Sequence, residues 1–162
     1  MTEGMKDDEI RDAIDRLNFS NVKKKICDKR SGLGWSQEKT DQVESDYKNM
    51  LFLWRKYPGE SLPPSKCVDE FWHAHILDTR KYMDDCQMIF GHYRHHNPYF
   101  GFGTPDGDEI LNRAFERTQQ LFFESTGDYL YEYEDEDADD DRQPKSAGSD
   151  RSTAQADQTL QR

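Results

Sequence analysis

Apolar residues recur three or four positions apart through residues 8–131, and this spacing predicts helices rather than strands. The clearest run lies between Ser36 and Pro58. Its apolar residues share one side of a helix with about 3.6 residues per turn: they are Val43, Tyr47, Met50, Leu51 and Trp54. No segment alternates apolar and polar residues over the length of a strand. We therefore predict an all-α fold.

Capping residues and glycines set the expected ends of about five helices. Ser20, Ser36 and Ser65 are expected N-caps, and Gly91 is expected to end a helix in the left-handed conformation. The expected segments are 8–17, 20–26, 36–54, 65–90 and 106–127. Asp78 is a further capping residue inside the fourth segment, so we expect that segment to bend there.

Composition divides the chain into a packed part and an acidic end. Eight Tyr, nine Phe and three Trp supply large side chains for a core. From residue 132 onward there are ten acidic and four basic residues and almost no apolar ones, a composition typical of disorder. We predict a flexible N-terminus over residues 1–7, a single compact domain over 8–131 and a disordered acidic tail over 132–162.

Charge and hydropathy argue against several classes of protein. The net charge is −11 and no basic stripe is present, so we expect no binding to nucleic acid or to an anionic membrane surface. No apolar run is long enough for a membrane span, and no secretory signal is visible, which together predict a cytoplasmic protein. Three widely spaced cysteines are expected to stay reduced there.

All five histidines lie between positions 73 and 96, which marks this segment as the place for chemistry. Two of them, His73 and His75, are two residues apart on a predicted helix and must point to opposite sides, so they cannot bind one ion together. Asp69 precedes His73 by one turn and shares its face. We predict that His73 faces the interior and that His75 faces solvent.

A loop rich in glycine, proline and aromatic residues follows the helical segment that carries Cys86. If this loop folds back, it brings His96 beside His73 and Cys86, with Asp69 as a ligand or as a hydrogen-bond partner of an imidazole. Imidazole and thiolate are the usual zinc ligands. The sequence thus predicts a transition-metal site, with zinc as the expected ion, made of His73, Cys86, His96 and Asp69; two further loop histidines, His92 and His95, are spare candidates.

Two other interpretations stay open. In the first, the cluster is structural core, and the protein is a non-enzymatic module that binds an unknown protein partner through the aromatic loop 92–102 or the acidic tail. In the second, Cys86 is a nucleophile activated by a histidine. Two neighbouring carboxylates, Asp84 and Asp85, raise a thiol pKa and weaken the thiolate, so the balance is against an enzyme.

Part of the chain resembles the glycine-rich-domain-containing-protein-like family, in particular its short bacterial members. The resemblance covers residues 20–125 and rests on a W-H…Y-x3-C…H-H-x-P pattern. The matching positions are Asp69, Trp72, His73, Tyr82, Cys86, Gly91, His96 and Pro98. The resemblance implies no established reaction. Larger plant relatives carry glycine-rich, proposed RNA-binding segments, but this chain has only ten scattered glycines, so that property is not expected here. His75 falls where relatives often have an apolar or aromatic residue.

Overall fold

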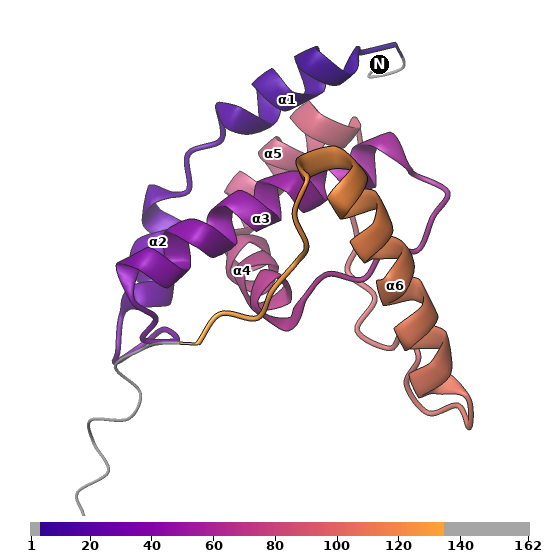
Figure 1. Cartoon of the computed structure of the whole chain (residues 1–162). Coiled ribbons are helices and arrows are strands. Elements are labelled where there is room, and N and C mark those ends of the chain that lie inside the picture. The colour runs from indigo at the N-terminus through magenta and orange to yellow at the C-terminus, as the bar shows by residue number, and fades with distance from the viewer. Residues whose placement is uncertain (1–3, 135–162) are drawn as a thin grey trace, which may run out of the picture.

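The computed structural model describes residues 4–134, and within that range it is all-α, with no strand (Figure 1). The six helices are α1 (Asp7–Asp15), α2 (Ser20–Cys27), α3 (Gln37–Lys56), α4 (Lys66–Leu77), α5 (Thr79–Phe90) and α6 (Gly107–Thr126). The predicted fold class is therefore confirmed, although the described residues form six helices rather than the expected five.

The additional helix arises at Asp78, where the expected bend is a complete break between α4 and α5. Asp78 leaves the helical conformation, with φ −80° and ψ 71°, and its N–H donates to the carbonyl of His75 over 3.1 Å. The outer ends of this helix pair are as predicted. The Ser65 hydroxyl caps α4 by accepting from the N–H of Val68, and Gly91 ends α5 in the left-handed conformation at φ 74°.

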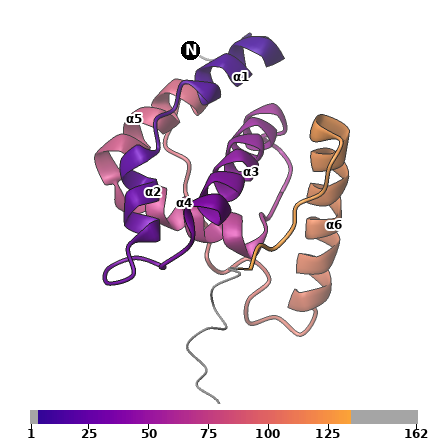
Figure 2. The same ribbon diagram turned by 60° about the vertical axis from the view of Figure 1, so that its left-hand side comes forward.

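Helix α3 is the centre of the fold and contacts α1, α2, α4 and α6. In Figure 2 it lies between α1, α2 and α5 on one side and α6 on the other. All five residues of its predicted apolar face are buried: Val43, Tyr47, Met50, Leu51 and Trp54. Burial of this aromatic-rich stripe is what holds the other helices around α3, because each large aromatic side chain removes much apolar surface from water.

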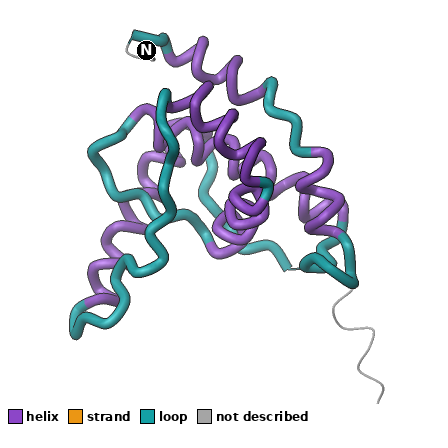
Figure 3. Tube along the Cα trace, turned by 180° about the vertical axis from the view of Figure 1, so that it is seen from behind, coloured by secondary structure: helices purple, strands orange, loops and turns teal. Residues whose placement is uncertain are grey.

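Helix α6 packs through only part of its length. Thr118 and Phe122, in its second half, are buried against the core, whereas Ile110 and Leu111 in its first half are exposed. The predicted apolar face of α6 is thus partly uncovered, and the helix leans away from the other five (Figure 1). The loop that joins α5 to α6 crosses the back of the molecule before α6 begins (Figure 3).

After α6 the chain returns across α3 and α4 as an extended stretch, residues 128–134, which we call the return segment (Figure 1). Leu130 is buried, and its N–H and carbonyl both bond to the side-chain amide of Gln119. The Glu132 carboxylate accepts from the N–H groups of Lys66 and Cys67, over 2.6 and 3.0 Å, at the start of α4. These bonds satisfy two of the unpaired donors that every helix start leaves.

The return segment contacts the helices beyond residue 131, where the domain is expected to end. Glu132 caps α4, and the hydroxyl of Tyr133 donates to Asp46 over 2.9 Å. The packed chain therefore extends at least to Tyr133, because two polar side chains there have specific partners. The remainder of the predicted acidic tail, residues 135–162, and residues 1–3 of the predicted flexible N-terminus lie outside the described residues.

The described residues also bear on membrane-spanning helices and on the state of the cysteines. No helix between residues 4 and 134 has the length and apolar character needed to cross a membrane. The three cysteines, Cys27, Cys67 and Cys86, are all free, as expected from their number and spacing.

We predict that Glu132→Ala lowers the free energy of unfolding by about 1–2 kcal/mol, because it leaves two N–H groups at the start of α4 without an acceptor. Urea denaturation at pH 7.5 measures the change. Glu134→Ala is the matched control, since it removes the same charge from an exposed side chain two residues away. Equal unfolding midpoints for the two variants would show that the cap does not stabilise the helix.

Asp46 predicts a pH-dependent effect on stability. Its burial raises the pKa to about 6, against an opposing effect of the hydrogen bond from Tyr133, so the folded state binds a proton more tightly than the unfolded state does. The resulting destabilisation is absent below the unfolded pKa, near pH 4, and complete above about pH 6. We expect Asp46→Asn to stabilise the protein by about 1–3 kcal/mol at pH 7.5 and by little at pH 4. Denaturant unfolding of both proteins at the two pH values tests this, and a pH-independent difference would contradict it.

Candidate metal centre

Helix α4 separates its two histidines, as helical geometry requires, but with the opposite orientation to the one predicted. The side chain of His73 is 45% exposed and that of His75 is 1% exposed. The buried residues of α4 are Cys67, Val68, Phe71, Trp72 and His75, so the buried face does not include Asp69 or His73. The prediction that His73 faces inward is therefore wrong.

His75 is held inside by hydrogen bonds at both ring nitrogens. Its Nδ1 lies 2.7 Å from the hydroxyl of Tyr47, and its Nε2 lies 2.9 Å from the Asp85 carboxylate. Lys81 also contacts that carboxylate, over 2.9 Å. An ionised carboxylate only accepts, so the Nε2–H of a neutral His75 donates to Asp85, and Nδ1 accepts from Tyr47.

The charges of this buried chain agree with that assignment. Burial lowers the pKa of His75, against the opposing effect of Asp85, and this favours the neutral ring. Burial acts to raise the pKa of Asp85, but the hydrogen bonds from His75 and Lys81 outweigh it, so the net shift is downward and the carboxylate stays ionised. Tyr47 is fully buried, and burial raises its pKa well above the ordinary value. We conclude that Tyr47–His75–Asp85 is a structural hydrogen-bond chain and not a nucleophile with its base.

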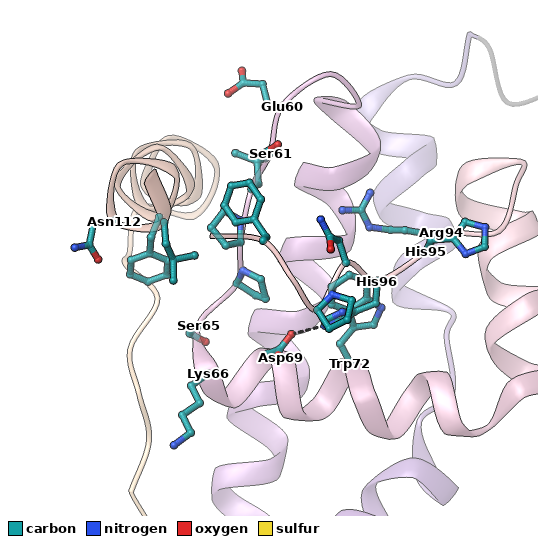
Figure 4. A pocket seen from close by; sticks show the side chains of 18 of the residues that line it. Glu60, Ser61, Ser65, Lys66, Asp69, Trp72, Arg94, His95, His96 and Asn112 are labelled. Carbon is teal, nitrogen blue, oxygen red and sulfur yellow. Dashed lines mark hydrogen bonds and ion pairs between the residues drawn. The ribbon is translucent and has the colours of Figure 1, made fainter. Parts of the chain in front are cut away.

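Asp69, His73 and His96 form the one group of potential metal ligands found among residues 4–134. The Nε2 of His96 lies 2.8 Å from one oxygen of Asp69 and 3.0 Å from the Nε2 of His73. The second oxygen of Asp69 lies 3.3 Å from the Nε2 of His73. In Figure 4, Asp69 and His96 point toward each other across the end of the pocket, with Trp72 beside them.

The loop after α5 places His96 over the helix. Trp72 Nε1 donates to the hydroxyl of Tyr82, which donates in turn to the carbonyl of Arg94 over 2.6 Å. These bonds tie the loop to the core two residues before His96. The His96 ring then packs against Trp72, with ring centroids 4.3 Å apart. His96 is thus positioned by residues of α4 and α5, whereas Asp69 and His73 are one helical turn apart on α4.

Hydrogen bonds among the three groups leave one unfavourable contact whichever nitrogens carry hydrogen. A ring nitrogen carries either one hydrogen or one lone pair. If both Nε2 atoms carry hydrogen, each N–H can donate to one Asp69 oxygen, but the two donor nitrogens then lie only 3.0 Å apart. If either nitrogen lacks hydrogen, its lone pair faces the Asp69 carboxylate instead. A cation between the three groups removes this conflict, because every lone pair then points at positive charge.

Cys86 lies outside this group, which corrects the predicted His/Cys cluster. Its side chain is buried, and it interacts with Tyr82 and with the backbone of Arg94. Burial raises the pKa of the thiol, so Cys86 has the character of a small apolar core residue and not of a reactive thiolate. Of the four predicted site residues, the structure brings together Asp69, His73 and His96.

The two spare histidines also lie apart from the group. His92 is exposed, and its Nδ1 approaches the carbonyl of Tyr93 over 3.1 Å. His95 is exposed, and its ring packs against Tyr93 with centroids 4.8 Å apart. Neither belongs to the ligand group found among the described residues.

A pocket of about 630 Å³ opens beside the candidate site, between α4, α6 and the loops before α4 and after α5 (Figure 4). Asp69 and His96 both line it. His73 instead lines a second pocket, of about 450 Å³, on the side of α4 that faces α2. The ligand group therefore stands at the edge between two hollows, and one of them gives direct access to Asp69 and His96.

Residues 9–121 match the model of the UCP032817-like family, so the chain belongs to this family. The matched region contains the whole ligand group and the Tyr47–His75–Asp85 chain, and it ends before the return segment. No curated protein matches the chain. No solved structure matches it either.

We predict that Tyr47→Phe lowers the free energy of unfolding by about 1–3 kcal/mol, because it leaves a buried nitrogen of His75 without a donor. Urea denaturation at pH 7.5 provides the measurement. Tyr99→Phe is the control, since it removes a hydroxyl from a side chain that is 71% exposed. If both variants unfold at the same urea concentration as the parent protein, the hydrogen bond to His75 does not stabilise the fold.

Proposed function

We propose that this protein binds a divalent transition-metal ion through Asp69, His73 and His96. The observation that carries the proposal is the convergence of the Nε2 atoms of His73 and His96, 3.0 Å apart, on the Asp69 carboxylate, whose two oxygens lie 2.8 Å from His96 and 3.3 Å from His73. Zinc and iron bind both imidazole nitrogen and carboxylate oxygen. Ligand atoms about 3 Å apart, each about 2.1 Å from one ion, subtend an angle of about 90° at that ion.

This angle bears on the identity of the metal. Zinc is the ion expected from the sequence, and a three-ligand zinc site keeps a further position open for water or substrate. Two histidines and one carboxylate on one face of the ion, at angles near 90°, are also the ligand set of non-haem iron(II) sites. We therefore propose a site with an open coordination position and treat zinc and iron(II) as the two ions to compare.

A protein-interaction module is the second candidate function. It is supported by the aromatic loop between α5 and α6, where Tyr99 and Phe102 are 71% and 77% exposed. Exposed aromatic side chains that lie close together are typical of contact surfaces. The two functions are compatible, because Tyr99 and Phe102 are separate from the ligand group, and the metal test replaces neither of them.

We also propose that the protein is related to the glycine-rich-domain-containing-protein-like family and that it is cytoplasmic. The first is supported by the W-H…Y-x3-C…H-H-x-P pattern, which contains His73 and His96. The second is supported by three free cysteines, since reduced thiols are usual in the cytosol. Absence of binding to nucleic acid or membranes remains a prediction from the net charge of −11.

Metal binding is tested on untagged, chelator-treated protein by calorimetric titration with Zn²⁺, and with Fe²⁺ under nitrogen. We expect one ion per chain and an affinity at least about tenfold lower in Asp69→Asn, His73→Ala and His96→Ala. Affinity should also fall at acid pH, because imidazole must be unprotonated to bind.

Two control variants separate this site from its alternatives. His92→Ala removes an exposed loop histidine, and Cys86→Ser removes the thiol of the predicted His/Cys cluster while nearly preserving its size. Both should bind metal as the parent protein does. An unchanged metal affinity in His73→Ala and His96→Ala, or far less than one ion bound per chain of the parent protein, would contradict the proposal.

A further inference from the structure

The pocket beside the ligand group combines apolar walls with polar side chains. Trp72, Phe100, Leu111 and Phe115 line it, together with several prolines. The exposed first half of α6 supplies Leu111, and the loop after α5 supplies Phe100. A hollow of about 630 Å³ with this lining suits the apolar body of a small organic molecule.

Arg94 places a positive charge in the same pocket, and no carboxylate among the described residues pairs with it (Figure 4). Its guanidinium lies over the ring of Trp54, 4.4 Å from the centroid. Its Nε is buried and has no hydrogen-bond partner among the described residues. The ionisable groups that act on it are Tyr47, Tyr82 and Cys86, which are neutral near pH 7 because burial raises the pKa of each.

The carboxylates at the far side of the pocket are engaged elsewhere. Glu60 pairs with Arg117 of α6 through two hydrogen bonds of 2.7 and 2.8 Å. Glu132 caps the start of α4. Neither is therefore a free counterion for Arg94. A half-buried guanidinium without a counterion gains from pairing with an anion that enters the pocket.

We propose that the pocket binds an organic carboxylate with an apolar body, whose carboxylate is held by Arg94 next to the metal ion at Asp69, His73 and His96. The planar fork of arginine matches the two oxygens of a carboxylate. Because the pocket offers a single guanidinium, we expect its ligand to carry one negative charge. The inference rests on the proposed function, since the open coordination position of the ion strengthens binding of the same carboxylate.

Tryptophan fluorescence tests the inference, because Trp72 lines the pocket and Trp54 lies beneath Arg94. The probes are cyclohexylacetate and its neutral analogue cyclohexylacetamide, titrated into zinc-loaded and metal-free protein. We expect the acid to bind at least about tenfold more tightly than the amide, and more tightly with zinc than without it.

Variants assign the effect to Arg94. Arg94→Met should weaken binding of cyclohexylacetate by about tenfold and leave the amide unaffected. Lys66→Met is the matched control, since it removes an exposed positive charge from the same pocket and should change the affinity by less than about twofold. Arg94→Lys keeps the charge without the planar fork, so we expect it to bind cyclohexylacetate with an affinity between those of the parent protein and Arg94→Met. It replaces Arg94→Met in the test if that variant fails to fold.

The outcomes separate this inference from the metal proposal. Equal binding of acid and amide, or unchanged binding of the acid in folded Arg94→Met and Arg94→Lys, overturns the inference whether or not zinc binds. An Arg94-dependent preference for the acid in metal-free protein supports it even if the calorimetric titration detects no metal. In that case the metal proposal is contradicted and the carboxylate inference is supported.

Discussion

The burial of His75 is the constraint on which the candidate site depends. Its two ring nitrogens join α3, through Tyr47, to α5, through Asp85, so α4 must present this residue to the core. A helix has a fixed angle between successive side chains. Once His75 points inward, Asp69 and His73 must lie on the outer side, where an ion can reach them.

Trp72 connects this buried arrangement to the site. Its indole N–H bonds to Tyr82, which also holds the carbonyl of Arg94, and its ring supports His96. One side chain therefore belongs to the core and also fixes the loop that brings the third ligand. The same loop carries Arg94 into the pocket, so the positions of the metal ligands and of the proposed carboxylate partner are coupled through the backbone of residues 94–96.

Local patterns predicted the helices well because helix formation is governed by short-range spacing and capping. Ser36, Ser65 and Gly91 act as expected at helix ends. Three of four predicted ligands converge, since Asp69 and His73 are one turn apart and the loop folds back. Cys86 was misassigned because its spacing places it on α5 without revealing which side of α5 meets α4. Arg94 was missed, although an arginine beside the histidines was the available signal.

The sequence by itself determined the all-α class, most helix ends and the separation of His73 from His75, because each follows from contacts within a few residues. Only the tertiary structure decided which of the two is buried. Either His73 or His75 could extend the apolar face of α4 into the core. The choice depends on hydrogen-bond partners on other helices, here Tyr47 and Asp85. The packing of Glu132 in the return segment was decided in the same way, since an acidic residue beyond α6 gains a structural role only when the start of α4 lies beside it.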